Sequence, residues 1–141
     1  MVDAEGKLYS NGTEITLKGL VTLVDNIRKM GKIPIFFTPP PGDGTDIGNC
    51  LLRHELRGQS LDGCDFEREN IHSLKVKITS QLKDITSANV VDLTDFICVG
   101  YTCRASLEGF YLYRDTGHLS YEGSSILGKT YNFFNLIVSA H

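Results

Sequence analysis

Two helical patterns, each followed by a short apolar run, constrain the fold of this chain more than any other feature of its sequence. Apolar residues recur at steps of three and four from Thr16 to Met30 and again from Phe66 to Ile85, which predicts a helix in each segment. The continuous apolar runs "KIPIFFT" (residues 32–38) and "NVVDL" (residues 89–93) follow these helices and are typical of buried strands. Helix and strand in alternation predict an α/β fold with a parallel sheet.

The remaining C-terminal segments add a hairpin and a last helix. Residues 97–106 and 109–113 are β-prone, are interrupted by glycines and predict a hairpin. Ser120 is the expected N-cap of a helix whose apolar face runs from 126 to 138. Two buried strands are few for a parallel sheet, so we expect the chain to contain only part of such a fold, without its first strands.

A loop rich in proline and glycine, "PPPGDGTDIGN" (residues 39–49), follows the first predicted strand. In open parallel sheets, loops at the carboxyl ends of strands line the ligand crevice. The glycines of this loop lack the spacing of a dinucleotide-binding turn, and Asp43 and Asp46 do not match a calcium loop. We therefore expect a loop that shapes a crevice and has no specific chemistry of its own.

Composition excludes several classes of function. A length of 141 residues, with 41% hydrophobic and 22% charged residues, fits one globular domain spanning residues 1–141. The net charge of −3 and the scattered basic residues argue against binding to nucleic acid. The longest apolar runs are far shorter than the ~20 residues that cross a bilayer, and "MVDAEGKLYSNG" has no apolar signal-peptide core. No motif indicates a metal or an organic cofactor, and none is expected.

Four cysteines, Cys50, Cys64, Cys98 and Cys103, include no C-x-x-C pair, which argues against a zinc ribbon or a thioredoxin-like site. They could form two disulfides, or remain four buried thiols as expected of a cytosolic protein. Of the three possible pairings, Cys50 with Cys64 and Cys98 with Cys103 join the residues closest in the chain. Closure of the Cys50 to Cys64 loop would stabilise the fold by about 3 kcal/mol.

The segment "YRDTGHLSYEGSS" (residues 113–125) places Asp115 three residues before His118. This spacing allows the carboxylate to orient the imidazole, which could then act as a general base on a serine hydroxyl. It equally fits a polar turn at the entry to the last helix, in which Asp115 caps backbone N–H groups and His118 is solvated. The spacing alone leaves both interpretations open.

Other polar and aromatic residues are weaker candidates. Arg114 could pair with an acidic group or with a substrate carboxylate. The three remaining histidines, His54, His72 and His141, are expected to be solvated or partly buried. Three tyrosines near the segment could stack on sugar rings, although aromatic residues at alternating strand positions more often pack against neighbouring strands; these are Tyr111, Tyr113 and Tyr121.

Three segments together carry a family resemblance: "TPPPGDGTDIGNCLLR", "VVDLTDFICVGYTC" and "LYRDTGHLSYEGSSILG". They resemble the C-terminal half of an SGNH (GDSL-like) hydrolase domain. More narrowly, they are similar to the periplasmic SGNH domains fused to membrane-spanning acyltransferase family 3 proteins, which O-acetylate bacterial surface polysaccharides such as O-antigen. The resemblance covers residues 32–138 and is most specific where "YRDTGHLS" matches the block Y-x-D-x-x-H-L-S.

The resemblance implies a fold and a mechanism. The implied fold is a partial flavodoxin-like three-layer SGNH fold, with a short parallel sheet flanked by helices and no N-terminal strands. The implied site combines a nucleophilic serine, an oxyanion hole built with a glycine and an asparagine, and the catalytic pair Asp115 and His118. The sequence contains no G-D-S segment, and Ser10 in "LYSNG" lacks the preceding buried strand that would hold a nucleophile on a sharp turn. We therefore expect a C-terminal fragment of a longer acyltransferase or esterase, inactive on its own.

The resemblance also implies partners and a location. The acceptor would be a polysaccharide or an acetylated glycan, and the acetyl donor would be relayed by an upstream membrane domain. The domain would lie in the periplasm, tethered to the inner membrane by a segment absent from these residues, and its cysteines would be oxidised. A free-standing chain would instead be cytoplasmic. The alternative function is a non-catalytic module that binds glycan or protein, and an open sheet edge would favour a homodimer.

Overall fold

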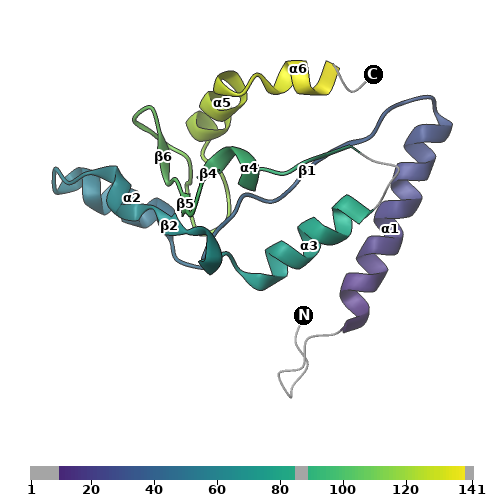
Figure 1. The fold of residues 1–141 in the computed structure, drawn as a ribbon, viewed down its shortest axis with the longest axis horizontal. Helices are drawn as coiled ribbons and strands as arrows, with labels where there is room; N and C mark the ends of the chain where they lie inside the picture. Colours follow the sequence, from purple (N-terminus) through teal and green to yellow (C-terminus); the bar gives the residue numbers. More distant parts are fainter. Residues whose placement is uncertain (1–9, 85–88, 139–141) are drawn as a thin grey trace.

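The computed structural model describes residues 10–84 and 89–138, and it contains both predicted helix–strand units (Figure 1). Helix α1 (Ser10–Lys29) precedes strand β1 (Ile35–Phe37), and helix α3 (Ser73–Asp84) precedes strand β3 (Asn89–Val91). The two strands pair in parallel, with Phe36 opposite Val90. The parallel α/β arrangement predicted from the alternation of helix and strand is therefore confirmed.

The C-terminal half contributes short antiparallel strands. Strands β4 (Cys98–Val99) and β5 (Thr102–Cys103) form one hairpin, and β6 (Ser106–Leu107) and β7 (Phe110–Tyr111) form another. The sequence predicted a single hairpin here. Each turn contains a glycine with positive φ, Gly100 at 60° and Gly109 at 81°, because a left-handed backbone suits glycine best.

Two elements near the middle of the chain differ from the sequence prediction. Helix α2 (Ile47–Leu56) begins inside the segment expected to be a loop, and the side chain of Asp46 caps it by accepting the N–H of Asn49. The helix predicted from 66 to 85 begins at Ser73, because strand β2 (Phe66–Glu67) pairs with β5. The 3-10 turns η1 (Leu61–Cys64) and η2 (Arg68–Asn70) precede and follow β2.

The last predicted helix is present as two pieces. Helix α5 (Tyr121–Thr130) begins after Ser120, whose hydroxyl accepts the N–H of Gly123 at 2.7 Å as predicted for an N-cap. The helix ends at Thr130, and α6 (Phe133–Val138) begins after the left-handed Asn132 (φ 48°). The predicted apolar face therefore continues across an interruption of the helix.

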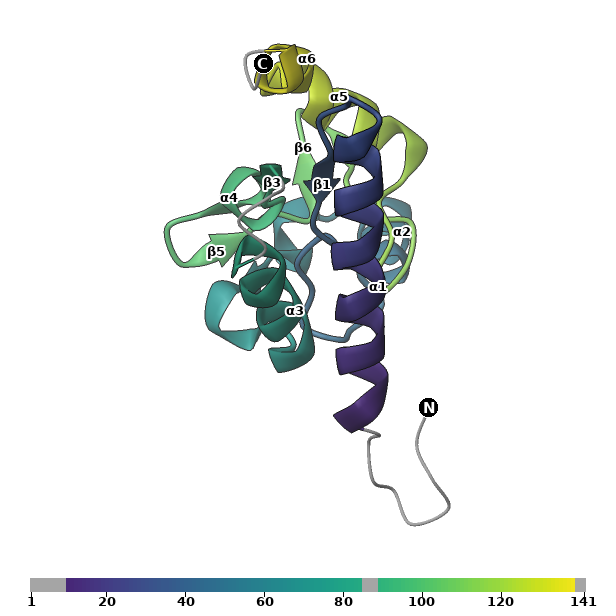
Figure 2. The ribbon, with the colours of Figure 1, turned by 90° about the vertical axis from the view of Figure 1, so that its right-hand side faces the viewer.

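Helices lie on two sides of the strands. Figures 1 and 2 place α5 and α6 on one side of the strands and α3 on the other, and Figure 1 places α1 and α2 at opposite ends of the molecule. The short helix α4 (Thr94–Ile97) joins β3 to β4. The main core lies between α2, α5 and the antiparallel strands; its most buried members are Ile47, Leu51, Ile97, Cys103, Ala105, Leu112, Tyr113 and Leu127.

The sheet topology agrees with a partial α/β fold. In the described part of the chain, β1 pairs with β3 and with no other strand, so the parallel sheet has two strands as predicted. None of the helices in the described residues is long and apolar enough to cross a bilayer.

Candidate functional site

Asp115 and His118 contact each other through both carboxylate oxygens. Nδ1 of His118 lies 2.9 Å from Oδ1 and 3.0 Å from Oδ2 of Asp115. The backbone N–H groups of Gly117 and His118 also donate to Oδ1, each at 2.9 Å. One carboxylate therefore both closes the turn and contacts the imidazole, and the catalytic role of the pair stays a prediction.

This arrangement sets the charge of Asp115 and the tautomer of His118. The pKa of Asp115 lies well below its usual range because three groups donate to or face its carboxylate. The N–H of Gly117 has the largest effect, followed by the ring of His118 and then by the N–H of His118. An ionised carboxylate can only accept hydrogen bonds, so the proton of the neutral ring lies on Nδ1. Nε2 then carries the lone pair, and the side chain of His118 is 70% exposed. That nitrogen is available to accept a proton.

Three contacts hold the turn that carries Asp115 and His118 in place. The N–H of Arg114 donates to the carbonyl of His118 and closes the turn. Tyr113 is fully buried, and its hydroxyl donates to the carbonyl of Pro41 at 2.8 Å. The first turn of α2 approaches so closely that a Cβ on Gly48 would lie 2.2 Å from the carbonyl oxygen of Arg114. Both the proline-rich loop and α2 thus position the turn.

A pocket of about 430 Å³ lies beside the pair. The proline- and glycine-rich loop lines it, as predicted for a loop after a parallel strand. Two residues at the start of α3 that the sequence did not single out for this site, His72 and Lys75, also line it. The full lining is Gly42, Gly44, His72, Lys75, Asp115, Thr116, Gly117 and His118.

Lys75 brings a positive charge to this pocket. Its Nζ donates to the carbonyl of Pro40 at 3.0 Å. Burial lowers the pKa of Lys75, and the negative charge of Asp43 opposes that shift. No signal in the sequence could place Lys75 or His72 here, because α3 is distant in the chain and meets the turn only in the folded protein.

A second pocket, of about 440 Å³, is also lined by Lys75, together with residues that follow β1 and β3, among them Pro39 and Asp92. Lys83 donates to Oδ2 of the buried Asp92 at 2.5 Å, and Thr38 donates to Oδ1 at 3.3 Å. Burial acts to raise the pKa of Asp92, but the hydrogen bonds from Lys83 and Thr94 outweigh it and lower that pKa. This ion pair was not predicted from the sequence.

The remaining candidates lie in different places. Arg114 forms a surface ion pair with Asp115, with Nε 3.2 Å from Oδ2. Tyr113 is buried and cannot stack on a ligand, whereas Tyr121 is 84% exposed. Tyr111 donates to Glu55, and this hydrogen bond raises its pKa to about 12. His141 and the side chain of Ser10 lie outside the described residues.

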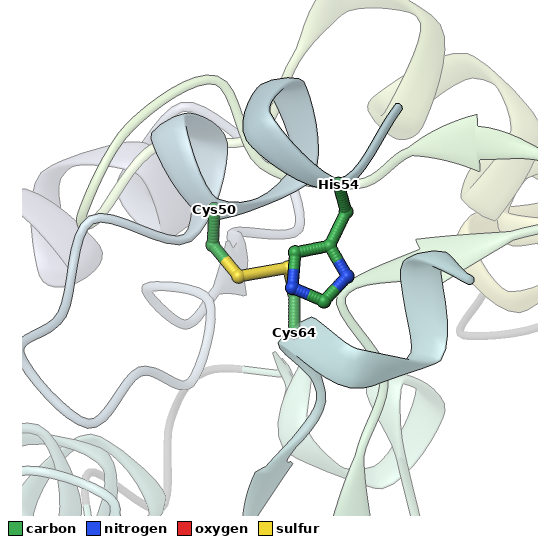
Figure 3. Close-up of side chains that lie close together, drawn as sticks. All are labelled: Cys50, His54 and Cys64. Carbon is green, nitrogen blue, oxygen red and sulfur yellow. A yellow bond between two sulfur atoms is a disulfide. The ribbon is translucent and has the colours of Figure 1, made fainter. Parts of the chain in front are cut away.

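The four cysteines form two disulfides, Cys50 with Cys64 and Cys98 with Cys103. These are the pairings between residues closest in the chain, and they leave no free thiol. Cys98 and Cys103 lie opposite each other on β4 and β5, so their disulfide closes that hairpin. Figure 3 shows His54 of α2 against the Cys50–Cys64 bond, partly buried as the sequence predicted.

Comparison with known proteins identifies the fold. A family model described as "SGNH domain (fused to AT3 domains)" matches residues 3–132. No curated protein matches the chain. The solved periplasmic domain of a lipopolysaccharide acetyltransferase from Salmonella ser. Paratyphi A is similar, with a TM-score of 0.64 and 13% sequence identity.

The similarity to that structure covers 96% of this chain and 54% of the other. The chain therefore spans about half the length of the solved domain, which agrees with a partial three-layer SGNH fold. The family model covers most of the chain and includes the turn of Asp115 and His118. This chain belongs to the family of SGNH domains that are fused to AT3 domains.

Proposed function

We propose that Asp115 and His118 form the general-base half of a serine acyl-transfer site that moves acetyl groups onto or off bacterial surface polysaccharide. The observation that supports this most directly is the contact of His118 Nδ1 with both oxygens of Asp115, at 2.9 and 3.0 Å. The same contact leaves Nε2 free to take a proton. The pocket beside the pair offers space for a substrate.

In the proposed mechanism the proton moves through Nε2 of His118. This atom removes the hydroxyl proton of a serine as the serine oxygen attacks the acetyl ester carbonyl. The imidazolium that forms is stabilised by the ionised Asp115, and the proton is then returned to the leaving alcohol. A glycan hydroxyl or water, activated by the same nitrogen, completes transfer or hydrolysis.

The proposal requires a serine that these residues do not supply in a recognisable motif. The sequence has no G-D-S segment, and the chain spans 54% of the solved acetyltransferase domain to which it is similar. We propose that the serine and the oxyanion-hole donors belong to polypeptide outside these 141 residues. An isolated chain should then have an oriented base with no nucleophile to activate.

We also propose an extracytoplasmic location. Two disulfides favour an oxidising compartment such as the bacterial periplasm, and the solved structural neighbour is itself a periplasmic domain. Attachment to a membrane-embedded acyltransferase domain would bring the acetyl donor. The acceptor would be the polysaccharide, which would enter the pocket beside His118.

The test has two parts. The purified 141-residue chain should not hydrolyse an aryl acetate. If it does, and if His118→Ala abolishes that hydrolysis, the proposal that the nucleophilic serine lies outside these residues is refuted. In the source organism, His118→Ala should lower the acetate released by alkali from the surface polysaccharide. Gly19→Ala, at a position in α1 where a Cβ meets nothing within 4 Å, serves as the control and should leave that acetate unchanged. Unchanged acetate in the His118→Ala strain would refute the catalytic role and favour a glycan-binding module.

A further inference from the structure

His54 and the two cysteines of one disulfide form a cluster of potential metal ligands. Cys50 and His54 lie one turn apart on α2, and Cys64 ends η1 (Figure 3). A nitrogen of His54 and the two sulfur atoms all lie within 4.8 Å of one another. In the oxidised protein the sulfurs bond to each other, so they are not available to a metal ion. Reduction would release two thiols beside an imidazole.

The ring of His54 is already oriented as a metal ligand. Nδ1 lies 2.7 Å from the carbonyl oxygen of Ser60. A carbonyl can only accept, so Nδ1 carries the proton and Nε2 carries the lone pair of the neutral ring. Figure 3 shows this second nitrogen on the side of the disulfide. Histidines that bind metals almost always donate their other ring N–H to a carbonyl or carboxylate in this way.

The spacing of the two cysteines suits a tetrahedral ion. Two thiolates at about 2.3 Å from one tetrahedral zinc ion lie roughly 3.8 Å from each other. The Cα atoms of Cys50 and Cys64 are 5.9 Å apart, a separation from which both sulfur atoms can reach one ion by rotation about the Cα–Cβ bonds. His54 would supply a third ligand and water the fourth.

Contacts other than the disulfide hold these segments together. A Cβ on Gly63 would lie 2.4 Å from Cε1 of His54, so the ring rests directly on the backbone of η1. The N–H of Gln59 donates to the carbonyl of His54 at 2.8 Å. Leu51 and Cys64 are both buried in the main core. The ligands therefore remain close when the S–S bond is broken.

We propose that reduction of the Cys50–Cys64 disulfide creates a zinc site whose ligands are the two cysteine sulfurs and Nε2 of His54. A dithiol reductant supplies two electrons and two protons and is itself oxidised to a disulfide. Zinc then displaces the two thiol protons as it binds. In the reverse direction, a disulfide oxidant accepts two electrons from the two thiolates and is reduced to a dithiol, which reforms the S–S bond and releases the ion. No third ligand of this kind lies beside Cys98 and Cys103 in the described residues.

The experiment is a titration of the untagged 141-residue chain with cobalt(II), followed by displacement with zinc. After reduction by a phosphine under anaerobic conditions, one cobalt ion per chain should bind, with thiolate-to-cobalt charge-transfer absorption and the visible bands of tetrahedral cobalt. The oxidised chain should show neither. If reduction unfolds the chain, addition of zinc should restore its circular dichroism, and failure to restore it would overturn the proposal.

Variants identify the ligands. His54→Asn keeps a side-chain donor near the position of Nδ1 but lacks Nε2, and it should weaken metal binding at least about tenfold. His72→Asn, which alters an exposed histidine elsewhere, should leave the affinity unchanged. The double variant Cys98→Ser/Cys103→Ser should retain the site, whereas Cys50→Ser/Cys64→Ser should lose it. Equal affinity in wild type and His54→Asn, or binding that follows the Cys98–Cys103 pair, would overturn the proposal.

Discussion

Nδ1 of His118 faces the carboxylate of Asp115 at 2.9 Å, within a turn that the same carboxylate closes by accepting two backbone N–H groups. The geometry couples the shape of the turn to the protonation of the ring. Asp115 has to be ionised and fixed in place to accept all three donors. The direction in which His118 presents its lone pair is therefore set by Asp115.

The first prediction concerns the tautomer of His118. In the wild type, the neutral ring should carry its proton on Nδ1. Asp115→Asn preserves an oxygen for the backbone N–H groups but presents an amide N–H to the ring, so the proton should move to Nε2. Long-range nitrogen–proton NMR at a pH where the ring is neutral distinguishes the two tautomers. The same tautomer in both proteins would contradict the proposed contact.

The second prediction concerns the support of this turn by α2. Gly48→Ala places a methyl group 2.2 Å from the carbonyl oxygen of Arg114, so either the helix or the turn has to shift. The free energy of unfolding should fall by at least about 1 kcal/mol, and the NMR signals of His118 should move.

Gly19→Ala in α1 is the matched control for this substitution. A Cβ on Gly19 would meet nothing within 4 Å. Because alanine favours a helix interior over glycine, Gly19→Ala should stabilise the protein by about 0.5–1 kcal/mol. Equal effects of the two substitutions in urea denaturation would rule out a specific clash at Gly48.

The third prediction concerns the buried hydroxyl of Tyr113. Tyr113→Phe removes the donor to the carbonyl of Pro41 and leaves that acceptor unpaired next to a fully buried residue. The expected loss is about 1–2 kcal/mol in the free energy of unfolding. Tyr121→Phe removes a hydroxyl from a residue that is 84% exposed and should have no measurable effect. An unchanged free energy of unfolding in Tyr113→Phe would mean that water replaces the lost hydrogen bond.

The sequence predicted those parts of the fold in which local pattern and tertiary environment agree. Helix α1 and the parallel pair β1 and β3 have strong periodicity or continuous apolar runs, and the Ser120 cap has a local signature. Helix α2 was not predicted, because its start contains Gly48 and follows directly on a proline-rich segment that is typical of a loop. Its stability instead comes from the burial of Ile47 and Leu51 and from the disulfide of Cys50.

Prediction failed where distant segments meet. Phe66 is a strand residue only because it pairs with Cys103, and nothing near it in the sequence signals that partner. The pair Asp115 and His118 could be proposed, since both residues lie in one turn. The pocket around them could not, because Lys75 of α3 and His72, which precedes α3, reach the turn only through tertiary packing.

The last prediction concerns stability in acid. The pKa of Asp115 is lowered in the folded protein, by the N–H of Gly117 first and by the ring and N–H of His118 next. In the unfolded chain the pKa of an aspartate is about 3.9. The stabilisation from ionised Asp115 is therefore complete above that value, and it is lost as the pH falls through the folded-state pKa. Urea denaturation of wild type and Asp115→Asn should show a stability difference that shrinks as the pH falls from 4 to 2. Every other carboxyl is common to the two proteins, so the change in their difference over this pH range isolates Asp115. A difference in the free energy of unfolding that stays constant from pH 4 to pH 2 would show that the contacts to Asp115 do not favour its ionised form.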